Sequence, residues 1–512
     1  PHARLLAAFN HLHIFLDPDP DPDKAPAERK RLFDLGGRDG GWHNYDQSII
    51  SEGGGIFDRS AKTIPLSPQV QAMLGLERDE APPDLVIHHI LKMEVDLLWN
   101  GGIGTYVKAS FETHADADDR SNDAVRVNAN ELRCKVVGEG GNLGFTQQAR
   151  IEADQTGVRL NTDAIDNSAG VDMSDHEVNL KILMAALVEQ DRLTGDARNV
   201  LLEELTDEVA HLVLENNNAH GRQISRDVIR SRMDVFQFAH AIAFVERTFN
   251  IRRDQLDLPS YRELQERAAD GEGLTRPELA VLGAYVKMYV YRELMAGEPK
   301  KIPGYDQLLM DYFPKRIQEE YEADIRGHML ADEIAMTVAT TQVIADGGAA
   351  LVPIMIETTG ASVQEIVTAF LKAERLARMR VVRSTLEELR TTVSLTTLSD
   401  GFVRIVEGAR MVSLYWLSAR GRVPTDAEID DMMKAVDRYT ELQAAEAGRI
   451  SRSRVQELLA DDIPEQVAEL IVKARFLNLA LMAWSVAKSS KSKKNALAES
   501  IIRLQAVGGG SG

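Results

Sequence analysis

The stretch LRCKVVGEGGNLGFTQQAR, residues 132–150, decides the fold of the first part of the chain. Residues 132–137 are mostly apolar on a charged background, which is typical of a strand covered on both faces of a parallel sheet. A glycine-rich loop follows this strand directly, and in an open α/β sheet ligands lie beyond the carboxyl ends of the strands. The stretch therefore predicts a binding loop that contains Gly138, Glu139, Gly140, Gly141 and Asn142.

A second polar loop is predicted a short distance downstream. The run VRLN at 158–161 indicates a short strand, and Asn167 and then Ser174 follow it. Because two neighbouring strand ends present their polar groups side by side, we expect this loop to lie beside the first. Ser174 also stands three residues before Glu177, the spacing of a capping box at a helix start. The serine therefore has both a structural and a binding interpretation.

A third glycine cluster follows the run VDLLW at 95–99. Asn100, Gly101, Gly102 and Gly104 come after this predicted strand, in position to contact the same ligand. The three glycines at 53–55 are interpreted as a flexible turn. Strands alternate here with glycine-rich turns and helical patterns, which predicts βαβ units and a parallel sheet within residues 1–185.

The run HIFLD at 13–17 predicts a further strand of this sheet, ending in Asp17. An acid at the end of the second strand of a dinucleotide-binding fold accepts hydrogen bonds from the adenosine ribose and repels the extra phosphate of NADP. The alternative is that Asp17 only starts a proline-stiffened turn, since PDPDPD follows at 18–23. No GxGxxG motif precedes this strand, so the phosphate-binding glycines of such a fold are expected upstream of residue 1.

Residues 186–505 predict a helical domain. Apolar residues recur there at helical spacing, as in VQEIVTAFLKAERLARM at 363–379, and predicted strands nearly vanish. Two helix starts carry capping boxes, formed by Thr275 with Glu278 and by Ser362 with Glu365. The basic run at 488–494 is interpreted as a solvated tail, and residues 506–512 as a flexible tail.

Composition excludes several classes of protein. The 512 residues include 59 Lys and Arg against 79 Asp and Glu, a net charge of −20 that repels nucleic-acid backbones and anionic membranes. No stretch approaches the roughly 20 apolar residues of a membrane span. Cys134 is the only cysteine, so no internal disulfide and no multi-cysteine zinc site can form, which predicts a cytoplasmic protein without a metal.

These motifs strongly resemble the glutamate dehydrogenase family, and most closely its large bacterial NAD-specific members. The family pattern EGANGP is matched at 139–142 and departs at Leu143 and Gly144, while NAGGVTVSYFEW is matched over 167–177, with departures at Asp172, Asp175 and His176. Segments of the large enzymes reappear as IISEGGGIFDR, TIPLSPQ, DLLWNGGIGTYV and GEGGNLGFTQQAR. The match covers most of residues 1–185 and continues more loosely through GLTRPELAVL at 273–282.

The resemblance implies an incomplete Rossmann-like NAD-binding domain at 1–185, which lacks its first strand and glycine turn, followed by the helical domain. It implies oxidative deamination of L-glutamate to 2-oxoglutarate and ammonia, with NAD as the cofactor. Asn142 then approaches the nicotinamide end, and Ser174, with Asn167 near it, contacts the carboxylate of the substrate. Asp17, the loop at 100–102 and the loop at 138–142 are the expected cofactor-binding residues.

The catalytic lysine and aspartate of the family belong to a preceding substrate domain and have no identifiable counterpart in this chain. The chain also begins without Met, inside what is interpreted as a helix, and ends in GGGSG. We therefore expect a C-terminal fragment that is inactive alone, with its catalytic residues upstream of residue 1.

Two alternatives stay open. The first alternative is a non-catalytic helical assembly or regulatory module derived from this family. The second is part of a dehydrogenase for another amino acid. In every case the large amphipathic helices predict subunit contacts and a homo-oligomer.

Three histidines and the one cysteine receive structural interpretations. We expect His176 to be a surface residue at a helix start, because no partner acid or nucleophile is identifiable. His88 and His89 lack a metal-ligand pattern and are interpreted as helix or core-edge residues. Cys134 lies in an apolar strand and is interpreted as an inert small hydrophobe.

Overall fold

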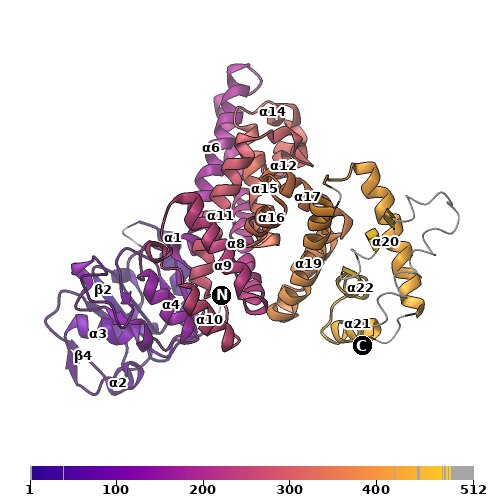
Figure 1. The fold of residues 1–512 in the computed structure, drawn as a ribbon. Helices are drawn as coiled ribbons and strands as arrows, with labels where there is room; N and C mark the ends of the chain where they lie inside the picture. The colour runs from indigo at the N-terminus through magenta and orange to yellow at the C-terminus, as the bar shows by residue number, and fades with distance from the viewer. Residues whose placement is uncertain are drawn as a thin grey trace, which may run out of the picture. The chain divides into compact units, whose positions relative to one another are not determined.

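The computed structural model describes residues 3–37, 40–419, 421–446, 450–474, 477, 480–482, 484 and 485. The chain divides into two compact units, Pro1–Ser168 and Ala169–Gly512. Figure 1 shows strands with short helices in the first unit and packed α-helices in the second. Residue 185, where the composition changes, lies inside helix α6, Ser168–Glu189. The predicted tails at 488–494 and 506–512 lie outside the described residues.

The first unit begins with an antiparallel sheet, β1-β2-β3, formed by Ala7–Phe9, His13–Leu16 and Gly55–Asp58. The predictions of a helix at the N-terminus and of a parallel strand at 13–17 are therefore wrong. Only three residues separate β1 from β2, whereas parallel strands need a crossover of about a dozen residues or more. The side chain of Asn10 closes this turn by accepting hydrogen bonds from the backbone N–H groups of Leu12 and His13.

Parallel pairing does occur in the second half of this unit. Strand β6, Leu97–Asn100, pairs with β9, Val136–Glu139, and β7, Val107–Lys108, pairs with β8, Val127–Asn128. The β9 strand begins four residues later than predicted, where Val136 comes into register with Leu97. The carboxyl ends of β6 and β9 lie at one edge, because Asn100 is opposite Glu139. The predicted α/β character of this region is confirmed in its parallel pairs.

One face of the β6–β9 pair is buried and the other is exposed. Val137 faces the core, whereas the indole of Trp99 is 61% exposed and Leu97 and Val136 are exposed on the same face. The remaining elements of the first unit are α1 Lys24–Leu35, β4 Ile64–Pro65, α2 Pro68–Leu74, β5 Glu80–Ala81, α3 Pro83–Leu91, α4 Gln147–Gln155 and α5 Asp163–Asp166.

The second unit is helical, as predicted from its apolar spacing, and the described residues form no strand after β9. The predicted capping boxes are confirmed, because Thr275 and Ser362 cap α11 and α17 with the help of Glu278 and Glu365. After α6 its principal helices are α7 Gly195–Glu204, α8 Thr206–Met233, α9 Val235–Phe249, α10 Tyr261–Ala269, α11 Arg276–Ala296, α12 Tyr305–Asp311, α13 Lys315–Glu320, α14 Glu322–Arg326, α15 Ala331–Gly347, α16 Leu351–Thr359, α17 Val363–Leu376, α18 Met379–Glu388, α19 Leu395–Ala419, α20 Asp426–Glu446, α21 Ile450–Ala460 and α22 Glu465–Lys473.

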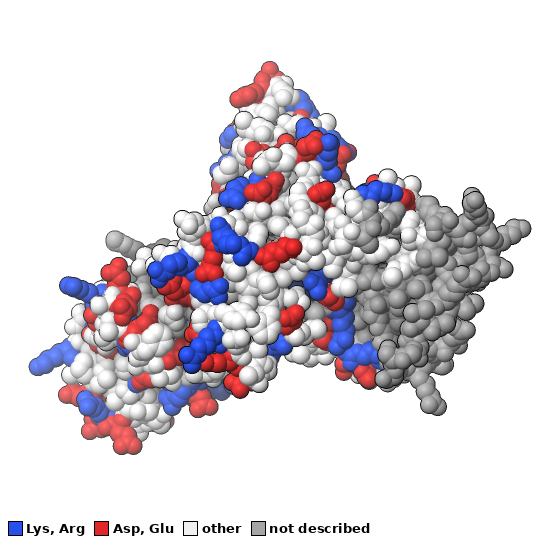
Figure 2. Space-filling view, viewed as in Figure 1, with Lys and Arg blue, Asp and Glu red and all other residues white. Residues whose placement is uncertain are grey.

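Charges of both signs are distributed over the molecule. Figure 2 shows acidic and basic side chains intermixed on the face that it presents. Among the described helices, none is by itself long and apolar enough to cross a membrane. Helices α15 and α16 pass that test only as a pair, which is bent by 89°.

Candidate functional site

Two glycine-rich loops meet at the carboxyl ends of β6 and β9. The backbone N–H of Gly140 donates to the carbonyl of Asn100 at 2.8 Å. A Cβ atom on Gly141 would lie 2.4 Å from the carbonyl oxygen of Gly102, and one on Gly144 would lie 1.8 Å from Nδ2 of Asn100. The glycines are therefore required here for the close approach of one loop to the other.

A buried ion pair holds the base of the loop after β9. Glu139, the last residue of β9, accepts hydrogen bonds from Nε and Nη2 of Arg150 in α4, at 2.7 and 2.9 Å. Asp163 lies 3.2 Å from the same guanidinium and also accepts the backbone N–H of Leu143 at 2.8 Å. Burial raises the pKa of the Glu139 carboxyl, and the hydrogen bonds from Arg150 oppose that rise. The pair thus fixes the loop between β9 and α4.

The sequence-predicted loops at 138–142 and 167 come together. Nδ2 of Asn167 donates to Oδ1 of Asn142 at 3.2 Å, and Asp166 accepts the backbone N–H of Glu139 at 3.0 Å. No regular strand forms at 158–161; Arg159 makes only an isolated parallel bridge to Val136. Asn142 and Asn167 are therefore neighbours in one site.

Asn100 supplies a polar group that has no partner in the described structure. Its Oδ1 accepts the backbone N–H of Gly102 at 3.2 Å, whereas its buried Nδ2 makes no hydrogen bond. A buried polar donor without a partner is uncommon and points to a missing acceptor. The indole of Trp99 lies over Gly138 and Gly140, since a Cβ on either would be about 2.5 Å from the ring. The free amide donor of Asn100 fits a polar ligand that carries a hydrogen-bond acceptor.

Asp17 lies elsewhere in the first unit, at the end of the antiparallel strand β2. Its side chain is fully buried, and Oδ1 accepts the backbone N–H of Ser51 at 3.1 Å. Its Oδ2 makes no hydrogen bond within the described residues. The strand that precedes Asp17 is not part of a parallel sheet, because β2 pairs antiparallel with both β1 and β3.

Ser174 lies in the second unit, within α6. The predicted capping box with Glu177 is wrong, because α6 begins at Ser168 and both residues lie inside the helix. Ser174 is exposed, and its hydroxyl donates to the carbonyl of Gly170 in the same helix at 3.2 Å. The hydroxyl thus lies on the solvent-facing side of the first turns of α6.

His176 is not the surface residue that the sequence indicated. It is 1% exposed, and its ring stacks on Tyr312 with centroids 4.0 Å apart and planes 7° apart. The sequence showed no partner acid or nucleophile for this histidine, but helix α6 directs His176 into the core of the second unit. Its pairing with a residue 136 positions later carries no local sequence signal.

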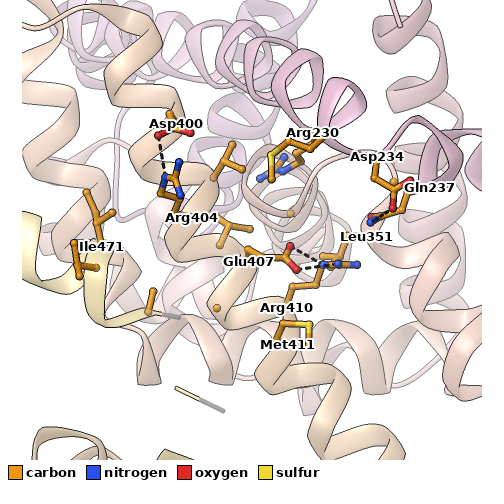
Figure 3. A pocket seen from close by; sticks show the side chains of 18 of the residues that line it. Arg230, Asp234, Gln237, Leu351, Asp400, Arg404, Glu407, Arg410, Met411 and Ile471 are labelled. Carbon is orange, nitrogen blue, oxygen red and sulfur yellow. Dashed lines mark hydrogen bonds and ion pairs between the residues drawn. The ribbon is translucent and has the colours of Figure 1, made fainter. Parts of the chain in front are cut away.

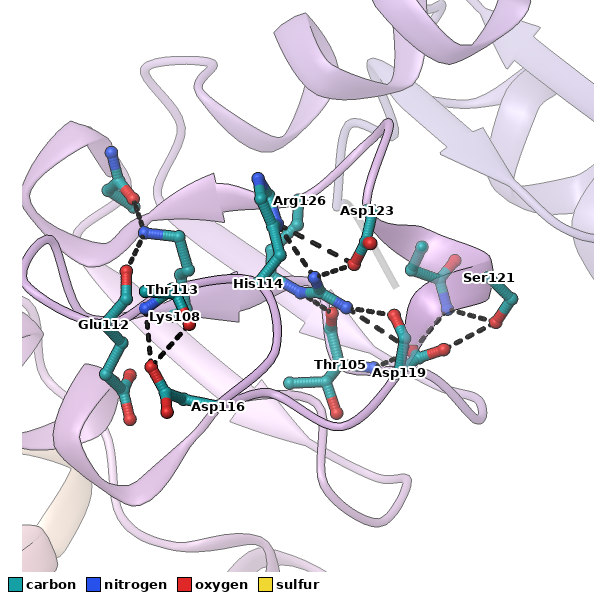
Figure 4. A network of polar contacts seen from close by, with 12 residues as sticks. Thr105, Lys108, Glu112, Thr113, His114, Asp116, Asp119, Ser121, Asp123 and Arg126 are labelled. Carbon is teal, nitrogen blue, oxygen red and sulfur yellow. Dashed lines mark hydrogen bonds and ion pairs between the residues drawn. The ribbon is translucent and has the colours of Figure 1, made fainter.

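A polar network that sequence reasoning missed supports the loop after β6 (Figure 4). Arg126 donates to the carbonyl of Thr105 at 2.8 Å, and Asp119 accepts the backbone N–H of Thr105 at the same distance. The hydroxyl of Thr105 donates to the carbonyl of Leu143 in the neighbouring loop at 2.7 Å. The network therefore joins the two loops of the site. Its only sequence signal was the run of charged residues at 112–126, which gives no pairing partners.

Asp119 is strongly acidic in this network. Burial works against ionisation, but hydrogen bonds from Ser121, Asn122 and Thr105, together with Arg126, outweigh it and lower the pKa of Asp119 to about 2. Lys108 lies at the other end of the network and donates to the carbonyl of Glu112 at 2.8 Å. Both charges are thus committed to bracing the loop at 105–128.

The second unit contains a cavity of about 550 Å³, lined by α8, α9, α16, α19, α21 and α22 (Figure 3). Within it, Arg404 and Arg454 both donate to Asp400, and Arg410 binds Glu407. Leu351, Met411 and Ile471 supply apolar surface. None of the sequence-predicted site residues lines this cavity.

The remaining residues singled out in the sequence have structural surroundings. Cys134 is buried, which raises the pKa of its thiol to about 11. His88 and His89 lie in α3, as predicted, and His89 contacts the carbonyl of Leu74. Within the described part of the chain, no group of three His, Cys, Asp or Glu residues is arranged to hold a metal ion.

Two family models match the chain in consecutive regions. Residues 1–227 match bacterial NAD-glutamate dehydrogenase, catalytic domain, and residues 271–507 match glutamate dehydrogenase, C-terminal. The first match contains both loops of the site and the first turns of α6.

Three relatives, each named NAD-specific glutamate dehydrogenase, are similar to the chain. The protein from Halomonas elongata is 37% identical over 97% of this chain, and that from Pseudomonas aeruginosa is 37% identical over 91%. The Mycobacterium tuberculosis protein is 46% identical over 68% of this chain. The chain spans 31%, 29% and 22% of the length of these relatives, respectively.

Proposed function

The chain belongs to the bacterial NAD-glutamate dehydrogenase family, and from this premise we propose that it is the C-terminal part of an NAD-dependent glutamate dehydrogenase. The proposed reaction is oxidative deamination of L-glutamate to 2-oxoglutarate and ammonia. NAD, when bound, accepts the hydride from the α-carbon of the substrate. The observation that carries the proposal is the edge where the loops after β6 and β9 meet.

We propose that this edge holds the nicotinamide half of NAD within a Rossmann-like domain. The parallel pairing of β6 with β9 supports it, because ligands of such sheets lie beyond the carboxyl ends of the strands. The proposed binding residues are Asn100, Gly101, Gly102, Gly138, Glu139, Gly140, Gly141 and Asn142. Asn100 offers its unsatisfied amide donor, and Glu139 acts by fixing the loop through Arg150.

Asp17 is proposed to bind the adenosine ribose. Its Oδ2 is an acceptor without a hydrogen-bond partner among the described residues, which suits a ribose hydroxyl. A carboxylate at this position also disfavours the extra phosphate of NADP. This accounts for a preference for NAD over NADP.

Ser174 and Asn167 are proposed to contact the substrate. The exposed hydroxyl of Ser174 is a donor for a carboxylate of glutamate, and Asn167 lies beside Asn142 in the first unit. We propose that the proton-handling residues lie outside this chain. By itself the chain is then expected to give no glutamate-dependent formation of NADH.

Saturation-transfer NMR on the 512-residue chain tests the cofactor site, because it detects weak binding. We expect the nicotinamide protons of NADH to receive saturation from the chain and Gly141→Ala to abolish the signal, since its Cβ would overlap the carbonyl of Gly102. The matched control is Gly195→Ala at the start of α7, outside the proposed site, whose Cβ would meet no atom within 4 Å. Equal signals from both variants would contradict the proposed site.

Substrate choice is tested on a longer polypeptide that contains this chain and has the length of its relatives. We expect NADH formation with L-glutamate at a rate at least tenfold above that with L-leucine or L-phenylalanine. Preference for either of the other amino acids would favour a dehydrogenase of different specificity. No turnover with any of the three would favour a non-catalytic assembly module.

We also propose a cytoplasmic location and a homo-oligomer. A single buried cysteine supports the first, since no disulfide can form. The amphipathic helices of the second unit, among them α17 and α18, support the second. Sedimentation of the purified chain tests the oligomer, and a purely monomeric species at micromolar concentration would contradict it.

A further inference from the structure

The first turns of α6 carry two different faces. Val171 is 67% exposed and Ser174 is exposed, and among the described residues the hydroxyl of Ser174 donates only within its own helix, to the carbonyl of Gly170. The other face carries Asp172, His176 and Asn179, which are directed into the second unit. Under the proposed function, on which this inference rests, the exposed face is the one that meets the substrate.

The buried face is held by three contacts from distant parts of the chain. Asp172 accepts a hydrogen bond from Nδ2 of Asn216 in α8 at 2.9 Å. His176 stacks on the ring of Tyr312, and Asn179 donates to the hydroxyl of Tyr312 at 2.9 Å. The tyrosine thus contacts two successive turns of α6 and lies directly after α12.

Helical geometry relates these contacts to Ser174. Positions 172, 176 and 179 are spaced by four and three residues, so they form one stripe along the helix. Ser174 is two residues from 172 and two from 176, a rotation of roughly 200° in either direction at about 3.6 residues per turn. Ser174 therefore lies almost opposite the stripe. Any rotation of α6 about its axis moves the stripe and the serine hydroxyl together.

The stack between His176 and Tyr312 has no competing hydrogen bond. Neither ring nitrogen of His176 has a hydrogen-bond partner in the described structure, and Oδ1 of Asp172 lies 3.8 Å from Nε2, beyond hydrogen-bond distance. Parallel rings at 4.0 Å contribute through dispersion and burial, which depend on ring shape. A phenylalanine ring can supply the same contact, whereas alanine cannot.

We propose that His176 and Tyr312 are positioning residues for substrate binding: their stack fixes the rotation of α6 and thereby aims the hydroxyl of Ser174. Asp172 and Asn179 add directional hydrogen bonds on either side of the stack. The buried stack involves His176, which lies two residues from Ser174 in the same helix.

A spin label at position 174 tests the proposal on the 512-residue chain itself. Ser174→Cys introduces an exposed thiol, while the one native cysteine, Cys134, is buried. We expect His176→Ala to shorten the apparent rotational correlation time of the nitroxide at position 174 at least twofold, seen as narrower spectral lines. His176→Phe should restore the parent spectrum. A label at Val200→Cys, an exposed position on α7, should not change. An unchanged spectrum at position 174 in His176→Ala would overturn the proposal.

Kinetics on the longer polypeptide separate positioning from general stability. We expect His176→Ala to raise KM for glutamate at least fivefold, with KM for NAD within twofold of the parent, and His176→Phe to restore both. An equal rise in both constants, or failure of phenylalanine to restore them, would also overturn the proposal. If the parent protein does not oxidise glutamate, the proposed function fails. The spin-label comparison still decides whether the stack fixes α6.

Discussion

Arg150 binds both carboxylate oxygens of Glu139, at 2.7 and 2.9 Å, with the two side chains 5% and 1% exposed. One residue ends β9 and the other lies in α4, so this pair joins the end of a strand to the helix that follows its loop. A bidentate pair fixes the direction as well as the distance between two elements. The glycine loop that it encloses is consequently held in one conformation.

Removing one partner of this pair leaves a buried charge. We expect Arg150→Met to lower the free energy of unfolding by about 3–5 kcal/mol, measured by urea denaturation. The control is Arg262→Met in α10, where both Arg262 and its partner Glu266 are exposed, and a much smaller loss is expected. Similar losses in the two variants would show that Glu139 and Arg150 are not a coupled buried pair.

The low pKa of Asp119 makes the first unit sensitive to acid. Its folded pKa of about 2 lies below the ordinary value of 3.8, so its stabilising contribution is complete above about pH 4 and is lost as pH falls toward 2. The difference corresponds to about 2 kcal/mol. We expect Asp119→Asn to lose that amount at pH 7 and to flatten the acid limb of the unfolding curve.

Asp96→Asn is the control for Asp119, because Asp96 and its partner Lys135 are both exposed. Its expected loss of stability is much smaller than that of Asp119→Asn, because water screens an exposed ion pair. If the free energy of unfolding of Asp119→Asn falls as steeply in acid as that of the parent, other carboxylates cause the acid sensitivity of the first unit.

His220 makes the second unit sensitive to acid in a higher pH range than Asp119 does in the first unit. Burial, followed by the charge of Lys287, lowers the pKa of His220 to about 4. In the unfolded chain the imidazole binds a proton near pH 6.5, whereas in the folded chain it does so only near pH 4. The contribution of His220 to the free energy of unfolding is therefore complete above pH 6.5 and falls as pH drops toward 4. We expect a loss of up to about 3 kcal/mol across that window from this residue.

His220→Gln should flatten the decline between pH 6.5 and 4, as followed by urea denaturation at several pH values. His211→Gln, at an exposed position of the same helix, should leave the slope unchanged. If the two variants have the same slope as the parent, the buried imidazole of His220 does not control this window.

Cys134 should resist alkylation in the folded chain. Burial raises the pKa of its thiol to about 11, so little thiolate forms at pH 8. We expect iodoacetamide to label the native chain at least 100-fold more slowly than the urea-unfolded chain, measured by intact mass. Rapid labelling of the native chain would mean that residues 132–137 open readily.

The helical second unit could be predicted well because its signals are local. Capping boxes at Thr275 and Ser362 depend on residues three apart, and the apolar stripe of α17 repeats within one helix. The glycine loops at 100–102 and 138–142 could also be found, since each directly follows a strand. Their close approach needed the register of β6 with β9, which no local pattern contains.

The errors share a physical cause. Residues 7–9 are an alanine-rich run with helical propensity, and pairing with β2 overrides that propensity. His176 follows two polar residues and precedes an acid, so its burial could not be inferred from hydropathy. Contacts with other elements determine both structures. Strand β1 pairs with β2 across a short turn, and His176 packs on Tyr312.

The exposed face of the β6–β9 pair has a practical consequence for handling the chain. Leu97, Trp99 and Val136 form an apolar surface on a two-stranded sheet, and no described strand covers the outer edge of β6. Bare edges with apolar faces are templates for pairing with another molecule. We therefore expect the isolated chain to aggregate more as its concentration rises. Trp99→Lys should lower the intensity of light scattered by the chain at the same concentration.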